Sequence, residues 1–329
     1  MPAPETSDIT IAITVYDRRD YLVQAVSSAL EQTLHGHRVL VVEDCGPDPT
    51  LHEFILKEFG ERITYHRNTR RRGLFDNWNA CIEACTTQWL CILHDDDFLE
   101  PTYLAAMFEL MDACPDRALY YGACHTVDRN GTRTITLPAP TKFTPSELPL
   151  EQWTNYDPVC FPGQLFKVAN ARAVGGFRPG SQYCGDWEMW FRLALRGGTA
   201  STNRVIANYR EHATLGRGTT RVDVSGRKYA YVNLQRKRHA AWLRESGIET
   251  RFDREARQCE TPMPTRFLLD HAHGFSPRML RYNAGLFFLS RAPHLSYRLV
   301  QMTVRLLSWR SLQVISLIAQ RLQGRRIHR

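Results

Sequence analysis

The sequence lacks the long apolar runs of membrane-inserted proteins and the start of an exported one. No window reaches the roughly 18 uninterrupted apolar residues of a membrane span, and the first residues, MPAPETSD, lack the positive start and apolar stretch of a signal peptide. The nine cysteines include no CxxC pair, and several, such as Cys91, lie in apolar runs. We therefore expect reduced thiols and a cytoplasmic protein that is neither exported nor threaded through a bilayer.

Acidic residues are nearly absent from the C-terminal part of the chain. Residues 262–329 contain eleven arginines and a single acid, Asp270, which is a surplus of ten positive charges. The whole chain has a net charge of +8, so residues 1–261 sum to −2. This distribution argues against a nucleic-acid-binding surface on the main domain and for an anionic partner of the basic tail.

The remaining composition is that of an ordinary globular protein, with 329 residues, 43% of them hydrophobic and 23% charged. Apolar runs typical of strands alternate with segments of helical periodicity. The expected strands are residues 9–15, 38–44, 63–68 and 89–94, with further strands at 118–128 and 204–212. We expect an α/β fold with a mostly parallel sheet flanked by helices. The expected divisions are a catalytic domain over 1–215, a helical linker over 216–261 and a basic amphipathic helical tail over 262–329.

The fourth expected strand ends in a histidine, and three aspartates follow it directly, in the stretch WLCILHDDDFLEP, residues 89–101. The carboxyl ends of parallel strands are where α/β sheets bind ligands. Three neighbouring carboxylates repel one another unless a cation neutralises them, which favours a metal site. The alternative is that these acids complement the dipole of a helix that starts at Pro101.

Several segments in a fixed order resemble the family 2 glycosyltransferases, which are inverting enzymes with the GT-A nucleotide-binding fold. The resemblance covers roughly residues 8–215. It rests on ITVYDRRDYLVQAVSSALEQT, VVEDCGPD, RNTRRRGLFDNWNACIEACTTQWLCILHDDDFLEP, VGGFRP, GDWEMWFRLALRGG and YREH. Two positions depart from the family pattern: His94 replaces the aspartate that often starts the acidic motif, and Arg178 stands where an acidic residue is usual.

The resemblance implies a divalent cation, Mn²⁺ or Mg²⁺, because hard oxygen ligands suit these ions and a leaving diphosphate needs neutralising charge. Asp96 matches the last acid of the family's DxD motif and is the first expected ligand, with Asp97 and His212 as further ligands. A lone histidine such as His212 is otherwise more often structural. Asp95 is expected on the donor, and Arg210 on its diphosphate.

The resemblance also implies which residues bind the donor nucleotide. A carboxylate at Asp44 can accept the N3–H of uracil or thymine, which predicts a UDP- or dTDP-sugar; the alternative is that Asp44 only caps the CGPDP turn. Thr14 and Tyr16, at the end of the first strand, are expected against the base and ribose, although Tyr16 could equally be packing. Asn77 and Asn79 flank Trp78 on a helix and are expected near the diphosphate.

Inversion requires a base that takes the proton of the acceptor hydroxyl. Asp186 opens the GDWEMW helix at the position that matches the family's base; a helix N-cap is the alternative role. Glu188 is the reserve candidate. Trp187 offers a stacking face for an acceptor sugar, although its helical spacing is also that of core packing.

These features predict transfer of a sugar to a saccharide or lipid-linked acceptor in cell-surface polysaccharide or glycolipid synthesis. A sugar-nucleotide pyrophosphorylase would need a glycine-rich loop after the first strand, where this chain reads TVYDRRD. A non-catalytic nucleotide-sugar-binding protein would not need Asp186. The tail alternates apolar residues and arginines, a pattern that fits either a helix lying on an anionic membrane surface or a helical pair packed on the catalytic domain.

Overall fold

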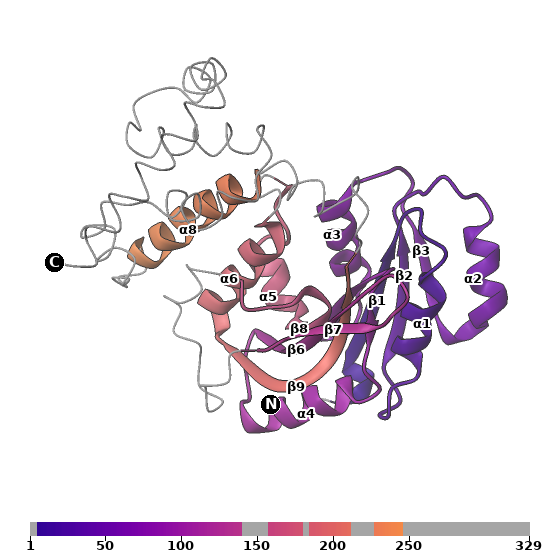
Figure 1. Ribbon diagram of the computed structural model, residues 1–329, viewed down its shortest axis with the longest axis horizontal. Coiled ribbons are helices and arrows are strands. Elements are labelled where there is room, and N and C mark those ends of the chain that lie inside the picture. The colour runs from indigo at the N-terminus through magenta and orange to yellow at the C-terminus, as the bar shows by residue number, and fades with distance from the viewer. Residues whose placement is uncertain (1–4, 140–156, 180–183, 212–226, 246–329) are drawn as a thin grey trace, which may run out of the picture. The chain divides into compact units, whose positions relative to one another are not determined.

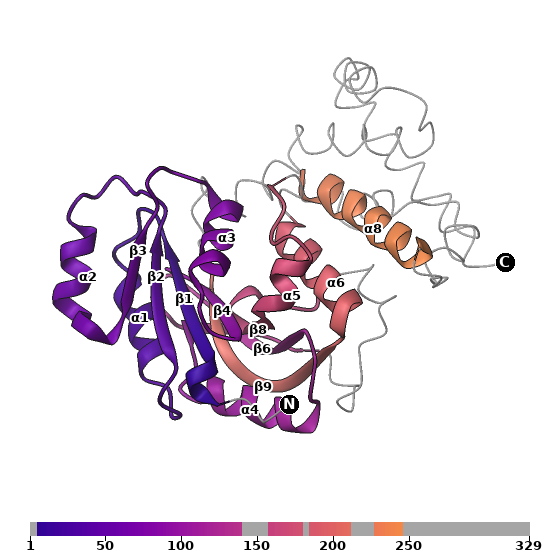
Figure 2. The same ribbon diagram turned by 180° about the vertical axis from the view of Figure 1, so that it is seen from behind.

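The computed structural model describes residues 5–139, 157–179, 184–211 and 227–245 of the chain. The chain divides into two compact units, Met1–Ala213 and Thr214–Arg329. The described part of the first unit is built on a nine-stranded sheet, seen from two sides in Figure 1 and Figure 2. The described part of the second unit is one helix, α8 (Arg227–Glu245), which falls within the expected linker. The basic tail, residues 262–329, lies outside the described residues.

The four strands expected in the N-terminal part are present and parallel. The sheet begins in the order β3-β2-β1-β4, and these strands are β1 (Ile9–Val15), β2 (Arg38–Glu43), β3 (Thr64–Arg67) and β4 (Trp89–His94). All residues of β1 are buried, because helices cover both faces of the sheet. This arrangement confirms the expected α/β architecture.

The other half of the sheet is mixed. The order continues through β8 (Gln164–Lys167), β6 (Leu119–Val127) and β9 (Thr199–Arg210) to β5 (Phe98–Leu99), while β7 (Arg133–Leu137) pairs with β6. β8 runs antiparallel to both β4 and β6, whereas β6 and β9 are parallel. β9, a long curved strand in Figure 1, starts before the expected residue 204, and the sequence did not predict β5 or β8.

The helices of the first unit form two layers. One hydrophobic core joins the side chains of Ile9, Ile11 and Ile13 in β1 to α1 (Leu22–Leu30), α2 (Leu51–Phe59) and α4 (Tyr103–Ala113). On the opposite face, α3 (Leu74–Ala84) contacts β1, β2 and β4, and α6 (Gly185–Gly197) contacts β6 and the short α5 (Val168–Ala173). Among the described helices, none has the length and apolar character that crossing a membrane requires. The eight cysteines in the described residues are all free thiols.

Candidate active site

The carboxyl ends of β1, β2 and β4 are in register. Thr14 lies opposite His94, and Val15 lies opposite Glu43. Asp44 follows Glu43 directly, and three aspartates follow His94. The polar residues that end these strands therefore lie along one edge of the sheet, the edge at which open α/β sheets bind ligands.

The acidic loop after β4 is held from several directions. Asp97 is almost fully buried; its Oδ1 accepts the backbone N–H of Arg210 at 2.8 Å, and its Oδ2 lies 3.4 Å from His94 Nδ1. Arg18, which follows β1, pairs with Asp96 and lies 3.7 Å from Asp95. Burial, partly offset by Arg18, raises the pKa of Asp95 to about 6.

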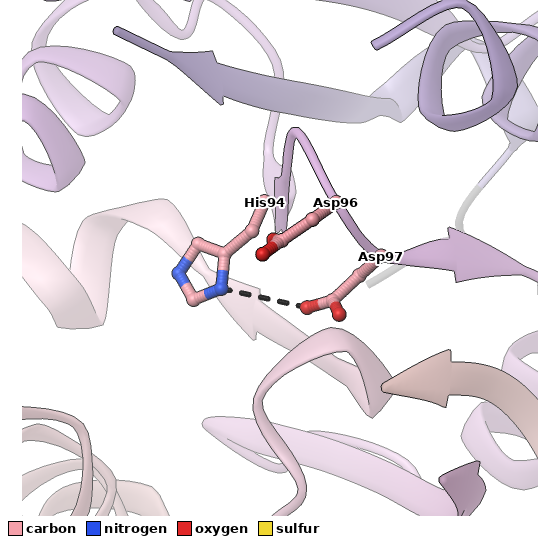
Figure 3. A group of neighbouring side chains, drawn as sticks. All are labelled: His94, Asp96 and Asp97. Atoms are coloured by element: carbon pink, nitrogen blue, oxygen red, sulfur yellow. Dashed lines mark ion pairs between the residues drawn. The ribbon is translucent and has the colours of Figure 1, made fainter. Parts of the chain in front are cut away.

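Three side chains of this loop could together hold a divalent ion. The ligand atoms of His94, Asp96 and Asp97 all lie within 4.8 Å of one another, and Figure 3 shows the three side chains converging. Two carboxylates and an imidazole form a donor set that suits a divalent metal. The residues present therefore fit such an ion. Of the ligands expected from the sequence, Asp96 and Asp97 are in this group, whereas His212 lies outside the described residues.

His94 packs against two aromatic rings that also contact each other. It stacks on Phe161 with ring centroids 4.1 Å apart and on Trp78 at 5.5 Å. Burial lowers its pKa to about 4; the charges of Asp95 and Asp186 oppose this fall. The imidazole is therefore neutral at physiological pH and keeps a lone pair for a ligand.

The Asp44 carboxylate binds the segment that leads into α3. It accepts the backbone N–H groups of Arg72 and Gly73 at 2.7 and 2.8 Å and the side-chain amide of Asn68 at 3.1 Å. Gly73 has a φ of +87°, a conformation that favours glycine. The turn after β2 is held by Glu43 instead, which accepts the N–H of Gly46 at 2.8 Å.

The other residues expected at the nucleotide have contacts within the protein. Thr14 Oγ1 donates to the carbonyl of Leu93 at 3.4 Å. Tyr16 is half-buried beneath the guanidinium of Arg71, which lies 4.2 Å from its ring centroid, a cation–π contact. Asn77 accepts a hydrogen bond from Asn68 at 2.9 Å.

Asn79 and Arg210 connect distant segments of the chain. Asn79 exchanges two hydrogen bonds of 2.8 and 2.9 Å with the backbone of Phe177. The guanidinium of Arg210 is buried and donates to the carbonyls of Asp96, Asp128 and Arg129 and to Gln24 Oε1. These contacts use every nitrogen of the guanidinium, so the structure places Arg210 as a support of the acidic loop.

Asp186 lies in the first turn of α6. Its Oδ1 accepts the backbone N–H of Trp187 at 2.9 Å, and burial raises its pKa. A second carboxylate, Asp157, lies near enough to interact with it: burial first and then the charge of Asp186 raise the pKa of Asp157 well above its ordinary value. Two buried carboxylates that repel each other in this way cannot both ionise easily.

The expected acceptor residues are directed inward. Glu188 is 1% exposed and forms a buried ion pair with Arg192, with Nη2–Oε2 and Nε–Oε1 distances of 2.6 and 3.0 Å. Arg178, one of the departures from the family pattern, lies 3.4 Å from the same carboxylate. Trp187 is also buried.

Three residues of this site were not assigned a role from the sequence: His94, Arg18 and Asp157. His94 was noted only as a departure from the acidic motif, although its place at a strand end signals a ligand. Arg18 lies in the segment TVYDRRD directly after β1, which ends at the same edge. Asp157 comes from a region in which the sequence shows no regular pattern, so no signal pointed to it.

The chain matches the model of the glycosyl transferase family 2 over residues 10–168. The succinoglycan biosynthesis protein ExoO of Rhizobium meliloti is 33% identical over 106 residues, which are 32% of this chain and 30% of that protein. Chondroitin synthase of Escherichia coli is 23% identical over 61% of this chain and 28% of its own length. The matched segments thus span less than a third of each of these two relatives.

Solved structures share the fold at low sequence identity. Residues 1–349 of Staphylococcus aureus TarS in complex with UDP-GlcNAc give a TM-score of 0.56 at 13% identity, covering 95% of this chain and 89% of that chain. The mannosyltransferase PcManGT from Pyrobaculum calidifontis, in complex with GDP-Man and Mn²⁺, gives 0.54 at 16% identity, covering 94% and 87%. Residues 10–168 are therefore similar to the glycosyl transferase family 2, and the chain has the GT-A-type fold that these solved structures share.

Proposed function

We propose that this chain is a metal-dependent, inverting glycosyltransferase that moves a sugar from a UDP- or dTDP-sugar to a hydroxyl group of a saccharide or lipid-linked acceptor. The observation that carries the proposal is the grouping of Asp44, the cluster of His94, Asp96 and Asp97, and Asp186. Asp44, His94, Asp96 and Asp97 lie at the carboxyl ends of the aligned strands β2 and β4. The charge of Asp186 opposes the fall that burial causes in the pKa of His94, so Asp186 lies near this cluster. The donor class is supported by the UDP-GlcNAc and GDP-Man complexes of the structural neighbours.

The contacts of Asp44 leave room for one further donor. A carboxylate offers about four lone-pair sites, and Arg72, Gly73 and Asn68 occupy three of them. The remaining site suits the single N3–H of uracil or thymine, which cytosine lacks. Tyr16, under Arg71, provides an aromatic face beside this position. Asp44 thus serves both the protein segment before α3 and the base.

Asp186 acts as the general base. Its carboxylate takes the proton of the acceptor hydroxyl while that oxygen attacks the anomeric carbon on the face opposite the leaving diphosphate. Burial raises the pKa of Asp186, which makes it a stronger base than a solvated aspartate. The pKa of Asp157 is also raised, by burial and by the charge of Asp186. A divalent ion held by His94, Asp96 and Asp97 would supply neutralising charge to the diphosphate.

The acceptor is a growing saccharide or a lipid-linked sugar in cell-surface polymer or glycolipid synthesis. The names of the relatives, a succinoglycan biosynthesis protein and a chondroitin synthase, support a polysaccharide context. The arginine-rich tail would bring the domain to the inner face of the plasma membrane, where lipid-linked acceptors lie.

The test combines donor binding with turnover. Thermal-shift measurements with UDP-, dTDP- and GDP-sugars in the presence of Mn²⁺ select the donor, and release of free nucleotide reports transfer. We expect EDTA to abolish release and Mn²⁺ or Mg²⁺ to restore it. Asp186→Asn should lower kcat at least about 100-fold with donor affinity retained. Asp112→Asn, which removes an exposed carboxylate on α4, is the matched control and should leave kcat unchanged.

Each failure has a distinct meaning. Full turnover in metal-free buffer would contradict the metal assignment. Near wild-type turnover by Asp186→Asn would place the base elsewhere. Donor binding without turnover over a broad acceptor panel would favour a nucleotide-sugar-binding protein.

A further inference from the structure

His94 is the only nitrogen-bearing side chain in the candidate metal group that the described residues form. Its Nδ1 faces the two carboxylates, as Figure 3 shows, and lies 3.4 Å from Asp97 Oδ2. Two ligand atoms that each lie about 2.1 Å from one ion are roughly 3.0 to 3.4 Å apart when they are neighbours in its shell. The observed separation is therefore already that of two ligands.

The ring is held in this orientation before any ion arrives. Phe161 and Trp78 stack on it with interplanar angles of 15° and 21°. The centroids of Phe161 and Trp78 lie 4.6 Å apart, so the two rings form one aromatic surface against the imidazole, and this packing restricts its rotation. The neutral imidazole is the form that binds metals. Nδ1 can then offer its lone pair to a metal while the ring proton resides on Nε2.

Resting on the metal-dependent function proposed above, we propose that His94 is a nitrogen ligand of the divalent ion and makes this centre select Mn²⁺ over Mg²⁺. Carboxylate ligands alone suit Mg²⁺ and Mn²⁺ alike, whereas imidazole suits transition metals. Mg²⁺ also demands near-ideal octahedral oxygen coordination and retains its waters. A rigid imidazole beside two buried carboxylates penalises Mg²⁺ more than Mn²⁺.

A nitrogen ligand can be observed directly, without relying on activity. In the full-length wild-type protein with Mn²⁺ and UDP, pulsed electron paramagnetic resonance should show coupling of the Mn²⁺ spin to ¹⁴N. Labelling with ¹⁵N-histidine should replace this signal by a ¹⁵N signal. The coupling should disappear in His94→Asp, which supplies the acid usual in the resembling family, and persist in His212→Gln, the control for the second candidate histidine.

Metal competition gives the second readout. Isothermal titration should show tighter binding of Mn²⁺ than of Mg²⁺ in the wild type. His94→Asp should reduce the ratio of the two affinities at least about tenfold, because changing residues that only orient a metal ligand already costs about 10- to 100-fold in affinity. The labelling experiment needs no substitution and remains decisive if His94→Asp does not fold.

The outcomes separate this inference from the proposed function. Mn²⁺ binding without histidine coupling, or coupling lost only in His212→Gln, would overturn the role of His94 and leave a metal-dependent transferase intact. Donor binding without any bound Mn²⁺ would overturn both. Coupling that depends on His94, together with an unchanged Mn²⁺/Mg²⁺ ratio in His94→Asp, would refute the selectivity while keeping the ligand.

Discussion

Gly185 begins α6, and the absence of a side chain lets this helix start against Phe75. A Cβ at this position would lie 1.9 Å from Phe75 Cε1, 2.6 Å from Cζ and 2.8 Å from Cδ1. Nonbonded carbons approach to about 3.5 Å, so Gly185→Ala must clear roughly 1.6 Å of overlap. Phe75 packs edge-on against Trp78, with centroids 5.1 Å apart, so part of the displacement falls on the helix start and on Asp186.

The expected cost in kcat follows from the position of Asp186, the proposed base. A displacement of about 1 Å at a reacting group can cost about 100-fold in rate. We expect Gly185→Ala to lower kcat by this factor. The KM for the donor should change by less than about twofold, because the residues proposed to bind the donor, Asp44 and the acidic loop, follow strands β2 and β4 and are not part of α6. Overpacking also costs about 1–3 kcal/mol of unfolding free energy, which lowers the melting temperature by several degrees.

The assay is nucleotide release at saturating donor, with donor affinity measured separately by titration. Phe75→Ala removes the atoms that collide with the new methyl group, so the double variant Phe75→Ala/Gly185→Ala should recover at least about tenfold of the lost kcat. Phe75→Ala alone is the control for the loss of the ring. Wild-type kcat in Gly185→Ala, or no recovery in the double variant, would refute the view that this contact positions Asp186.

Three further measurements follow from the charges. Burial raises the pKa of Asp95 in the folded protein to about 6. Its protonation therefore stabilises the fold at low pH, and this contribution is lost as the pH rises through 6. Without divalent ions, the melting temperature should fall more steeply from pH 5 to 7 in the wild type than in Asp95→Asn. Arg18 pairs with Asp95 and Asp96 and would compete with a metal ion for these carboxylates. Arg18→Gln should therefore lower the Kd for Mn²⁺ about fivefold, as expected for a partly exposed ion pair worth ~1 kcal/mol. An unchanged Kd would contradict this competition between Arg18 and the ion. Deletion of residues 262–329 should abolish salt-sensitive binding to anionic vesicles, to which each basic residue contributes ~1 kcal/mol, while donor binding persists; vesicle binding by the truncated protein would show that the tail is not the anchor.

The parallel half of the fold was predictable because its signals are local. Continuous apolar runs mark strands buried on both faces, and helical periodicity lies between them. β1, β2 and β4 matched their expected ranges within one residue, so the alignment of Asp44 with the acidic loop followed from topology. Figure 2 shows these strands side by side.

The other half depends on contacts that no local pattern records. β5 is two residues long, and β8 pairs with strands more than forty residues away in sequence, β4 and β6. The pairing of Arg18 with Asp96 and the proximity of Asp157 to Asp186 arise only when these segments meet. For the same reason, the inward direction of Glu188 and the supporting role of Arg210 were not evident from their positions.

The contact between β9 and the acidic loop has a consequence for folding during synthesis on the ribosome. Arg210 holds Asp97 through its backbone N–H and the carbonyl of Asp96 through Nε, although 113 and 114 residues separate these pairs. At about 5–20 residues per second, the ribosome adds Arg210 roughly 6 to 23 s after the aspartates. During that interval the Asp97 carboxylate and the Asp96 carbonyl lack this partner. The emerging chain therefore completes the arrangement of its candidate metal group only when the first unit is nearly complete.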